Sequence, residues 1–208
     1  MNWALSWPWL ALALLGAYHG LNPGMGWLFA VARGLQEGSR GALLASLVPI
    51  VIGHEASLVL VLGVAVVSQE LLPPHTVRLL AALALVSVGV YRVARPRSHP
   101  GGFGMRVGRV GLAAWSFLMS SAHGAGLMLV PVLLGLPVVQ QLPAAGQPGM
   151  LVVMSTAVHV TAMLIVMAST ALVVYQVVGL RILRPSWFNL DLVWAASLTA
   201  AGLITMFS

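Results

Sequence analysis

The sequence contains no cysteine and few charges of either sign. Of its 208 residues only 7% are charged: ten are basic, all of them arginine, and four are acidic. The lack of cysteine excludes disulfides, thiolate metal sites and thiol-relay chemistry. Soluble domains are about one quarter charged, and the chain lacks the phosphate-binding, dinucleotide-binding and nucleophile motifs of soluble enzymes. We therefore expect a protein that is neither soluble nor an enzyme.

The chain consists instead mostly of long apolar segments. Its residues are 60% hydrophobic with a mean hydropathy of +0.98, and a membrane crossing needs about 20 apolar residues. We predict an all-α polytopic membrane protein, a single transmembrane domain over residues 1–208 with six spans. The first span is expected to be broken near residues 22–24. The predicted spans are about Trp3–Val31, Ala42–Val67, Val77–Val93, Val110–Leu136, Met150–Val178 and Leu190–Phe207.

The arginines predict an orientation. Nine of the ten fall in or beside the first, third and fifth connections, and Arg78 alone falls on the other side. Arginine collects in cytoplasmic loops. We therefore expect both termini to face away from the cytoplasm, in a bacterial-type inner (plasma) membrane. The net charge of +6 then reflects topology, and we predict no nucleic-acid partner. A short polar turn is expected over Arg33 to Arg40.

Two stretches place a histidine beside helix-weakening residues inside an apolar run. The first is residues 19–25, His-Gly-Leu-Asn-Pro-Gly-Met, and the second is residues 123–128, His-Gly-Ala-Gly-Leu-Met. Two further histidines, His54 and His159, lie in the spans that follow. An offset of 104 residues aligns the first histidine of each set, and an offset of 105 aligns the second. The four histidines thus form two pairs at nearly equal spacing.

This spacing predicts an internal repeat. We expect repeat A over about 3–94, a linker over about 95–109 and repeat B over about 110–208. Each repeat holds an odd number of spans, so the second must enter the membrane from the opposite side. Such inverted repeats occur in many secondary transporters, whose substrates bind near the midplane at broken helices. We predict that the two histidine stretches form the halves of one intramembrane site.

The candidate ligands suit a transition-metal ion. Neutral imidazole binds nickel, cobalt, zinc and copper. Glu55 is a carboxylate within a span and needs a cation, a proton or a histidinium as its partner. Asn22 shares a helical face with His19, Met25 offers a thioether, and serines at helical spacing from the later histidines are interpreted as packing residues. The predicted metal site comprises His19, His54, His123, His159, Glu55, Met25 and Asn22.

The first histidine stretch resembles the His-Gly-x-x-Pro-Gly-His stretch of nickel/cobalt efflux proteins. The segments Arg40-Gly-Ala-Leu-Leu and Gly53-His-Glu-Ala-Ser resemble the region that follows it. These proteins belong to the lysine-exporter superfamily, which includes nickel/cobalt permeases. The resemblance covers about residues 10–67 and implies inverted three-helix halves with His19 and His54 as metal ligands. Met25 stands where the family has a second histidine, and residues 95–109 hold one histidine in place of a histidine-rich loop.

The sequence therefore predicts a secondary transporter of a divalent or soft transition-metal cation, nickel or cobalt with copper or zinc as alternatives. The metal is substrate, and no permanently bound cofactor is expected. The expected partners are the lipid bilayer, the metal ion and coupling protons, with a homo-oligomer or a larger membrane complex as the assembly. Three alternatives stay open at this point. One is a b-type cytochrome with haem held by histidine pairs, and another is a non-transporting subunit of a membrane complex. The third is an exporter of small organic solutes, which the resemblance to the superfamily also allows.

Overall fold

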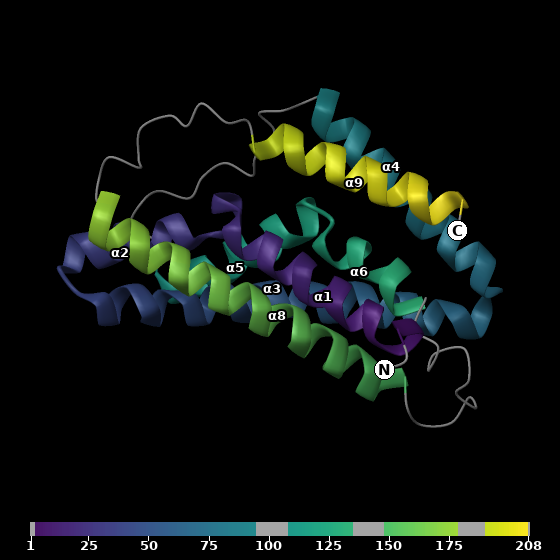
Figure 1. Cartoon of the computed structure of the whole chain (residues 1–208), viewed down its shortest axis with the longest axis horizontal. Helices are drawn as coiled ribbons and strands as arrows, with labels where there is room; N and C mark the ends of the chain where they lie inside the picture. The colour runs from purple at the N-terminus through teal and green to yellow at the C-terminus, as the bar shows by residue number, and fades with distance from the viewer. Residues whose placement is uncertain (1–2, 95–107, 135–147, 179–189, 208) are drawn as a thin grey trace.

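The computed structural model describes residues 3–94, 108–134, 148–178 and 190–207 (Figure 1). Within these ranges the chain forms helices and no strand, which confirms the predicted all-α class. Most of the predicted 95–109 linker lies outside the described residues. The elements are α1 (Trp3–Leu21), the 3₁₀ turn η1 (Pro23–Met25), α2 (Trp27–Glu37), α3 (Arg40–Leu71), α4 (Pro74–Ala94), α5 (Arg109–Ala122), α6 (Ala125–Leu134), α8 (Pro148–Val173), the π-helical η2 (Val174–Val178) and α9 (Leu190–Phe207).

Two of the described helices are long and apolar enough to cross a membrane. They are the 29-residue segments Arg40–Ser68 and Gly149–Val177, and α5 with α6 makes a third candidate if this bent pair is one span. Large apolar side chains cover the outer faces of the helices: Leu14 of α1 and Ile52 of α3 are each about 60% exposed. Apolar surface of this extent on a helix is typical of contact with lipid.

The first predicted span is broken where the sequence placed the break. Helix α1 ends at Leu21, Asn22 is extended, and the chain turns through η1 into α2. The freed backbone groups are satisfied locally: the Trp27 indole N–H donates to the Leu21 carbonyl (3.2 Å), and the Gly24 N–H donates to Asn22 Oδ1 (2.8 Å). Such compensation is required of a broken helix inside a membrane.

The fourth predicted span is broken within the second histidine stretch. It is divided into α5 and α6, whose axes are bent by 57° at a break after Ala122. Gly124 has a φ of 68°, a left-handed conformation that an L side chain rarely adopts. The break therefore falls at the histidine-glycine pair of the second stretch, the counterpart of the first break.

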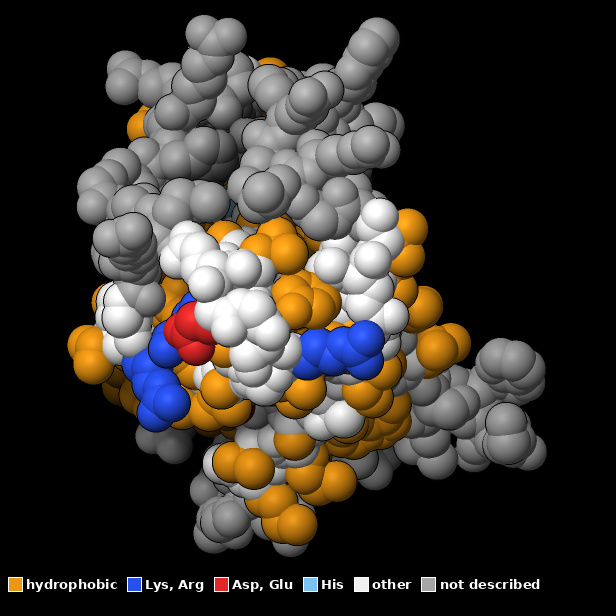
Figure 2. Space-filling model, turned by 90° about the vertical axis from the view of Figure 1, so that its left-hand side faces the viewer, with side chains coloured by type: hydrophobic (Ala, Val, Ile, Leu, Met, Phe, Trp, Pro, Cys, Tyr) orange, Lys and Arg blue, Asp and Glu red, His pale blue; other side chains and the backbone are white. Residues whose placement is uncertain are grey.

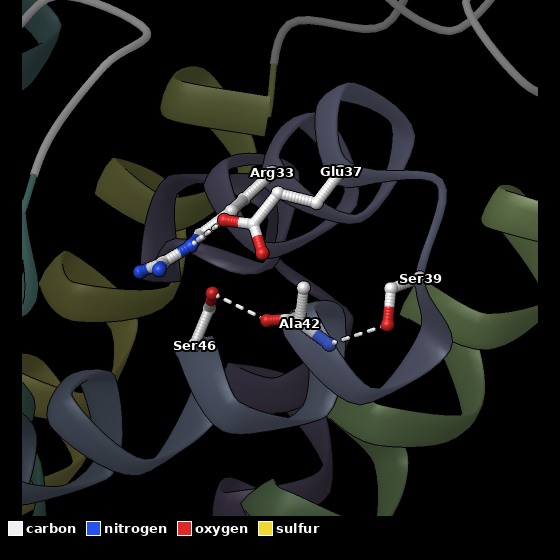
Figure 3. Close-up of polar contacts among 5 residues, drawn as sticks. All are labelled: Arg33, Glu37, Ser39, Ala42 and Ser46. Atoms are coloured by element: carbon white, nitrogen blue, oxygen red, sulfur yellow. Dashed lines mark hydrogen bonds and ion pairs between the residues drawn. The ribbon is translucent and has the colours of Figure 1, made fainter.

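The predicted polar turn from Arg33 to Arg40 is shorter than expected. Helix α2 continues to Glu37, and Arg33 Nε donates to Glu37 Oε1 at 2.7 Å within it (Figure 3). Gly38, with a φ of 60°, ends the helix, and Ser39 Oγ accepts from the Ala42 N–H to begin α3. Figure 2 shows charged side chains at this end of the molecule, surrounded by apolar ones.

Helices distant in the sequence lie side by side in two parallel pairs. Along α1 and α8, Gly16 lies against the backbone of His159 and Gly20 lies against that of Met163, so both helices run in the same direction (Figure 1). Along α3 and α5, Ser116 Oγ donates to the Ile50 carbonyl (2.7 Å), and the hydroxyls of Ser57 and Ser121 are 2.9 Å apart one to two turns later. This pair is also parallel.

A third pair, α4 and α9, is antiparallel. A Cβ on Gly89 would meet Thr199 Oγ1, and one on Gly202 would meet the Val86 side chain (2.7 Å). Thr199 lies three residues before Gly202, and Val86 lies three residues before Gly89. Each glycine therefore packs against the equivalent side chain of the other helix. This reciprocal contact is what a two-fold relation between the two helices produces.

Candidate functional site

Three histidine rings from three helices meet in the interior. His19 comes from α1, His54 from α3 and His159 from α8, and their side chains are 0%, 1% and 0% exposed. The ring centres of His19 and His159 are 4.9 Å apart, those of His19 and His54 are 5.5 Å apart, and those of His54 and His159 are 5.7 Å apart. We call these three residues the histidine cluster.

Two rings of the cluster are oriented by backbone carbonyls of α1. His19 Nδ1 is 2.7 Å from the Leu15 carbonyl oxygen, and His159 Nδ1 is 3.2 Å from the Leu12 carbonyl oxygen. A carbonyl only accepts, so Nδ1 of each ring carries the proton and Nε2 carries the lone pair. A carbonyl in this role is what fixes the tautomer of metal-binding histidines. Both rings therefore present a ligating nitrogen.

The remaining ring has no such support. Neither Nδ1 nor Nε2 of His54 has a hydrogen-bond partner among the described residues, and the same holds for His159 Nε2. The His54 ring is stacked on that of His159 with an interplanar angle of 4°. Burying a polar atom without a partner costs about 1–3 kcal/mol. The cluster is therefore an unfavourable arrangement unless something binds it.

The spacing of the cluster suits one ion, although its nitrogens do not converge as the rings stand. Imidazoles sharing a tetrahedral ion at about 2 Å have ring centres roughly 5 Å apart, close to the three distances above. However, no group of three or more His, Asp or Glu side chains in the described part of the chain is arranged to hold a metal ion. Binding would require the rings to rotate. The His54 ring can rotate without breaking a hydrogen bond to any described residue.

The two helix breaks face each other, which brings Asn22 toward His123. His123 ends α5, its Nδ1 is 2.8 Å from the Met119 carbonyl oxygen, and its side chain is buried. A Cβ built on Gly24 would lie 3.8 Å from His123 Nε2 and 3.0 Å from Asn22 Oδ1. The structure thus places His123 and Asn22 near one another, where the two broken segments approach.

Asn22 has a structural task, because its side-chain oxygen caps η1. Asn22→Ala removes this acceptor, and we expect a loss of about 1 kcal/mol of unfolding free energy, typical of a deleted cap. Thermal unfolding of the purified protein in detergent measures it. Asn22→Ser keeps a capping oxygen and should retain most of the stability. Equal melting temperatures for the alanine and serine variants would contradict this role.

The structure does not join Met25 or Glu55 to the histidine cluster by any described contact. Met25 is buried in the apolar core. Glu55 follows His54 on α3, so its side chain points about 100° away around the helix. It is partly exposed, and its Oε2 is buried without a partner among the described residues. Their assignment as ligands stays a prediction.

Sequence reasoning missed the carbonyls that orient the cluster. Leu15 lies four residues before His19, a helical spacing that any sequence contains, and Leu12 reaches His159 only because α1 and α8 pack together. The resemblance to nickel/cobalt efflux proteins rests on residues 10–67 alone. Comparison of the chain with protein-family models, curated proteins and solved structures gives no match.

Proposed function

We propose that this protein is a secondary transporter of a transition-metal cation, with the histidine cluster as the substrate site. The observation that carries the proposal is the burial of three imidazoles together in a chain with little charge. Both nitrogens of His54 and Nε2 of His159 have no hydrogen-bond partner among the described residues. Intramembrane ionisable groups are costly and mark substrate pathways. A borderline metal ion is the ligand that three neutral imidazoles bind best.

The spacing of the cluster favours an ion over haem. Two imidazoles that ligate one haem iron stand on opposite faces of the macrocycle, and bonds of about 2 Å then separate the ring centres by roughly 6 Å or more. The three ring separations are 4.9, 5.5 and 5.7 Å, all shorter than this. A Soret band in the purified protein would nevertheless favour the b-type cytochrome.

The relative directions of the helices support six crossings in two inverted halves. If six spans alternate in direction, the first and fifth run parallel, the second and fourth run parallel, and the third and sixth run antiparallel. The packed pairs α1–α8, α3–α5 and α4–α9 have these relations. The reciprocal contact of α4 with α9 is what an inverted repeat requires where its equivalent helices meet. The cluster would then draw histidines from both halves.

The arginines support the predicted orientation. Arg33 and Arg40 lie at the α2–α3 end, and Arg109 opens α5, which runs beside α3 from that same end. Arg78 lies near the start of α4, which follows the far end of α3. We assign the α2–α3 end to the cytoplasm, so both termini lie on the other side. The remaining loop arginines, at positions 95, 97, 106, 181 and 184, are outside the described residues.

Metal content tests the proposal. We expect purified protein incubated with Ni²⁺, Co²⁺, Zn²⁺ or Cu(I) to retain a stoichiometric ion by elemental analysis, and proteoliposomes to take up the same ion. His19→Ala should abolish both results. His75→Ala is the matched control, since His75 is exposed in the first turn of α4, although the sequence suggested a loop there. Retention of the ion by His19→Ala, or its absence from wild type, would overturn the proposal and favour a non-transporting subunit.

A further inference from the structure

Several hydroxyl groups inside the described helices share one bonding pattern. A serine or threonine in an apolar helix usually satisfies its hydroxyl by donating to the carbonyl of the residue four positions earlier. This pattern occurs four times in three of the described helices, α3, α8 and α9, at distances of 2.7–2.9 Å. The hydroxyls concerned are those of Ser46, Ser68, Ser169 and Thr199.

Ser120 and Ser155 make no such bond. Both side chains are 0% exposed, and neither Oγ has a hydrogen-bond partner among the described residues. The carbonyls of Ser116 and Leu151, four residues earlier, belong to the same helices α5 and α8. Rotation about one bond would bring each hydroxyl toward such a carbonyl. Neither hydroxyl makes the bond to its own helix that Ser46, Ser68, Ser169 and Thr199 make.

Both serines lie one helical turn before an intramembrane histidine. Ser155 is four residues before His159, so the two side chains share a face of α8. Ser120 is three residues before His123. It is also at the level of His54 across the α3–α5 interface, because the contacts Ser116–Ile50 and Ser57–Ser121 bracket that level from both sides. Ser120 Oγ and the two His54 nitrogens are thus buried polar atoms at a similar level of this interface, without a hydrogen-bond partner among the described residues.

We propose that the Ser120 and Ser155 hydroxyls belong to the substrate site and bind water carried by a partly hydrated divalent cation. A metal-bound water is a strong donor, and a hydroxyl that makes no bond to its own helix can accept from it. Nitrogen ligands with oxygen groups around them suit Ni²⁺, Co²⁺ or Zn²⁺, whereas Cu(I) prefers sulfur ligands. This inference rests on the proposed function and narrows the substrate to divalent ions.

Alanine variants of the two serines test the inference against a matched control. Ser120→Ala and Ser155→Ala should each raise the dissociation constant for Ni²⁺ about tenfold, the lower end of what loss of an outer-sphere partner causes. Their melting temperatures without metal should be unchanged or higher, since an unpaired buried hydroxyl is removed. Ser46→Ala deletes an equally buried hydroxyl that bonds its own helix, and it should leave Ni²⁺ binding unchanged.

A second variant separates loss of a hydroxyl from misfolding. Ser120→Cys keeps the size and replaces oxygen by sulfur, and it should shift the preference from Ni²⁺ toward Cu(I) in a competition assay. Wild-type Ni²⁺ affinity in both alanine variants, with binding still lost in His19→Ala, would overturn this inference and leave the proposed function standing. Wild-type protein that binds none of Ni²⁺, Co²⁺, Zn²⁺ and Cu(I) would instead overturn the proposed function.

Discussion

His54→Leu is expected to abolish metal transport while making the folded protein more stable. Both nitrogens of His54 are buried without a partner among the described residues. Leucine is similar in size and has no polar atoms, so the substitution removes the penalty of about 1–3 kcal/mol for burying a polar group without a hydrogen bond. Loss of one of three ligands should reduce metal affinity by at least about 100-fold, beyond the effect of losing an outer-sphere partner. Uptake into proteoliposomes and thermal unfolding in detergent measure the two effects separately.

The opposite signs of these two effects distinguish a substrate ligand from a packing residue. A histidine kept for packing would destabilise the protein when replaced. His19→Leu provides the contrast, because its Nδ1 donates to the Leu15 carbonyl and that bond would be lost. We expect His19→Leu to abolish uptake without the gain in melting temperature. Lower stability of His54→Leu, with uptake unchanged, would show that the ring is structural.

Local features of the fold were predictable from the sequence. Asn22, Pro23 and Gly24 follow His19 within an apolar run, and this combination cannot continue a regular helix. The break between α1 and η1 accordingly lies where it was predicted. Long apolar segments likewise predicted helices, and α3 and α8 are the clearest cases. In both cases the residues that determine the feature lie within a few positions of it in the sequence.

Features that depend on contacts between distant helices were not predictable. The sequence marked residues 123–128 as helix-weakening, yet it did not predict that the helix ends at His123 and that Gly124 adopts a left-handed φ, because glycine is common in membrane helices. The sequence paired the four histidines by spacing, yet which rings meet is decided by packing. His159 reaches His19 because α8 lies parallel to α1, and no local pattern encodes that pairing.

Gly16 is the position where that packing should be most sensitive to substitution. A Cβ on Gly16 would overlap the backbone carbonyl of His159, which cannot move aside as a side chain can. Gly16→Ala should therefore push α1 away from α8 and lower the unfolding free energy by about 1–3 kcal/mol, the usual cost of overpacking. The same shift would separate His159 from the Leu12 carbonyl and from the His19 ring, so metal binding should weaken with stability.

Gly63→Ala is the matched control, since a Cβ on Gly63 of α3 meets nothing within 4 Å among the described atoms. Alanine is favoured over glycine in a helix by about 0.5–1 kcal/mol, so this variant should unfold at the wild-type temperature or above and bind metal normally. Thermal unfolding and metal titration of both variants make the comparison. If Gly16→Ala matched Gly63→Ala in both measurements, α1 and α8 would have to be further apart than the structure has them. His159 would then lose the helix contact that places its ring beside that of His19.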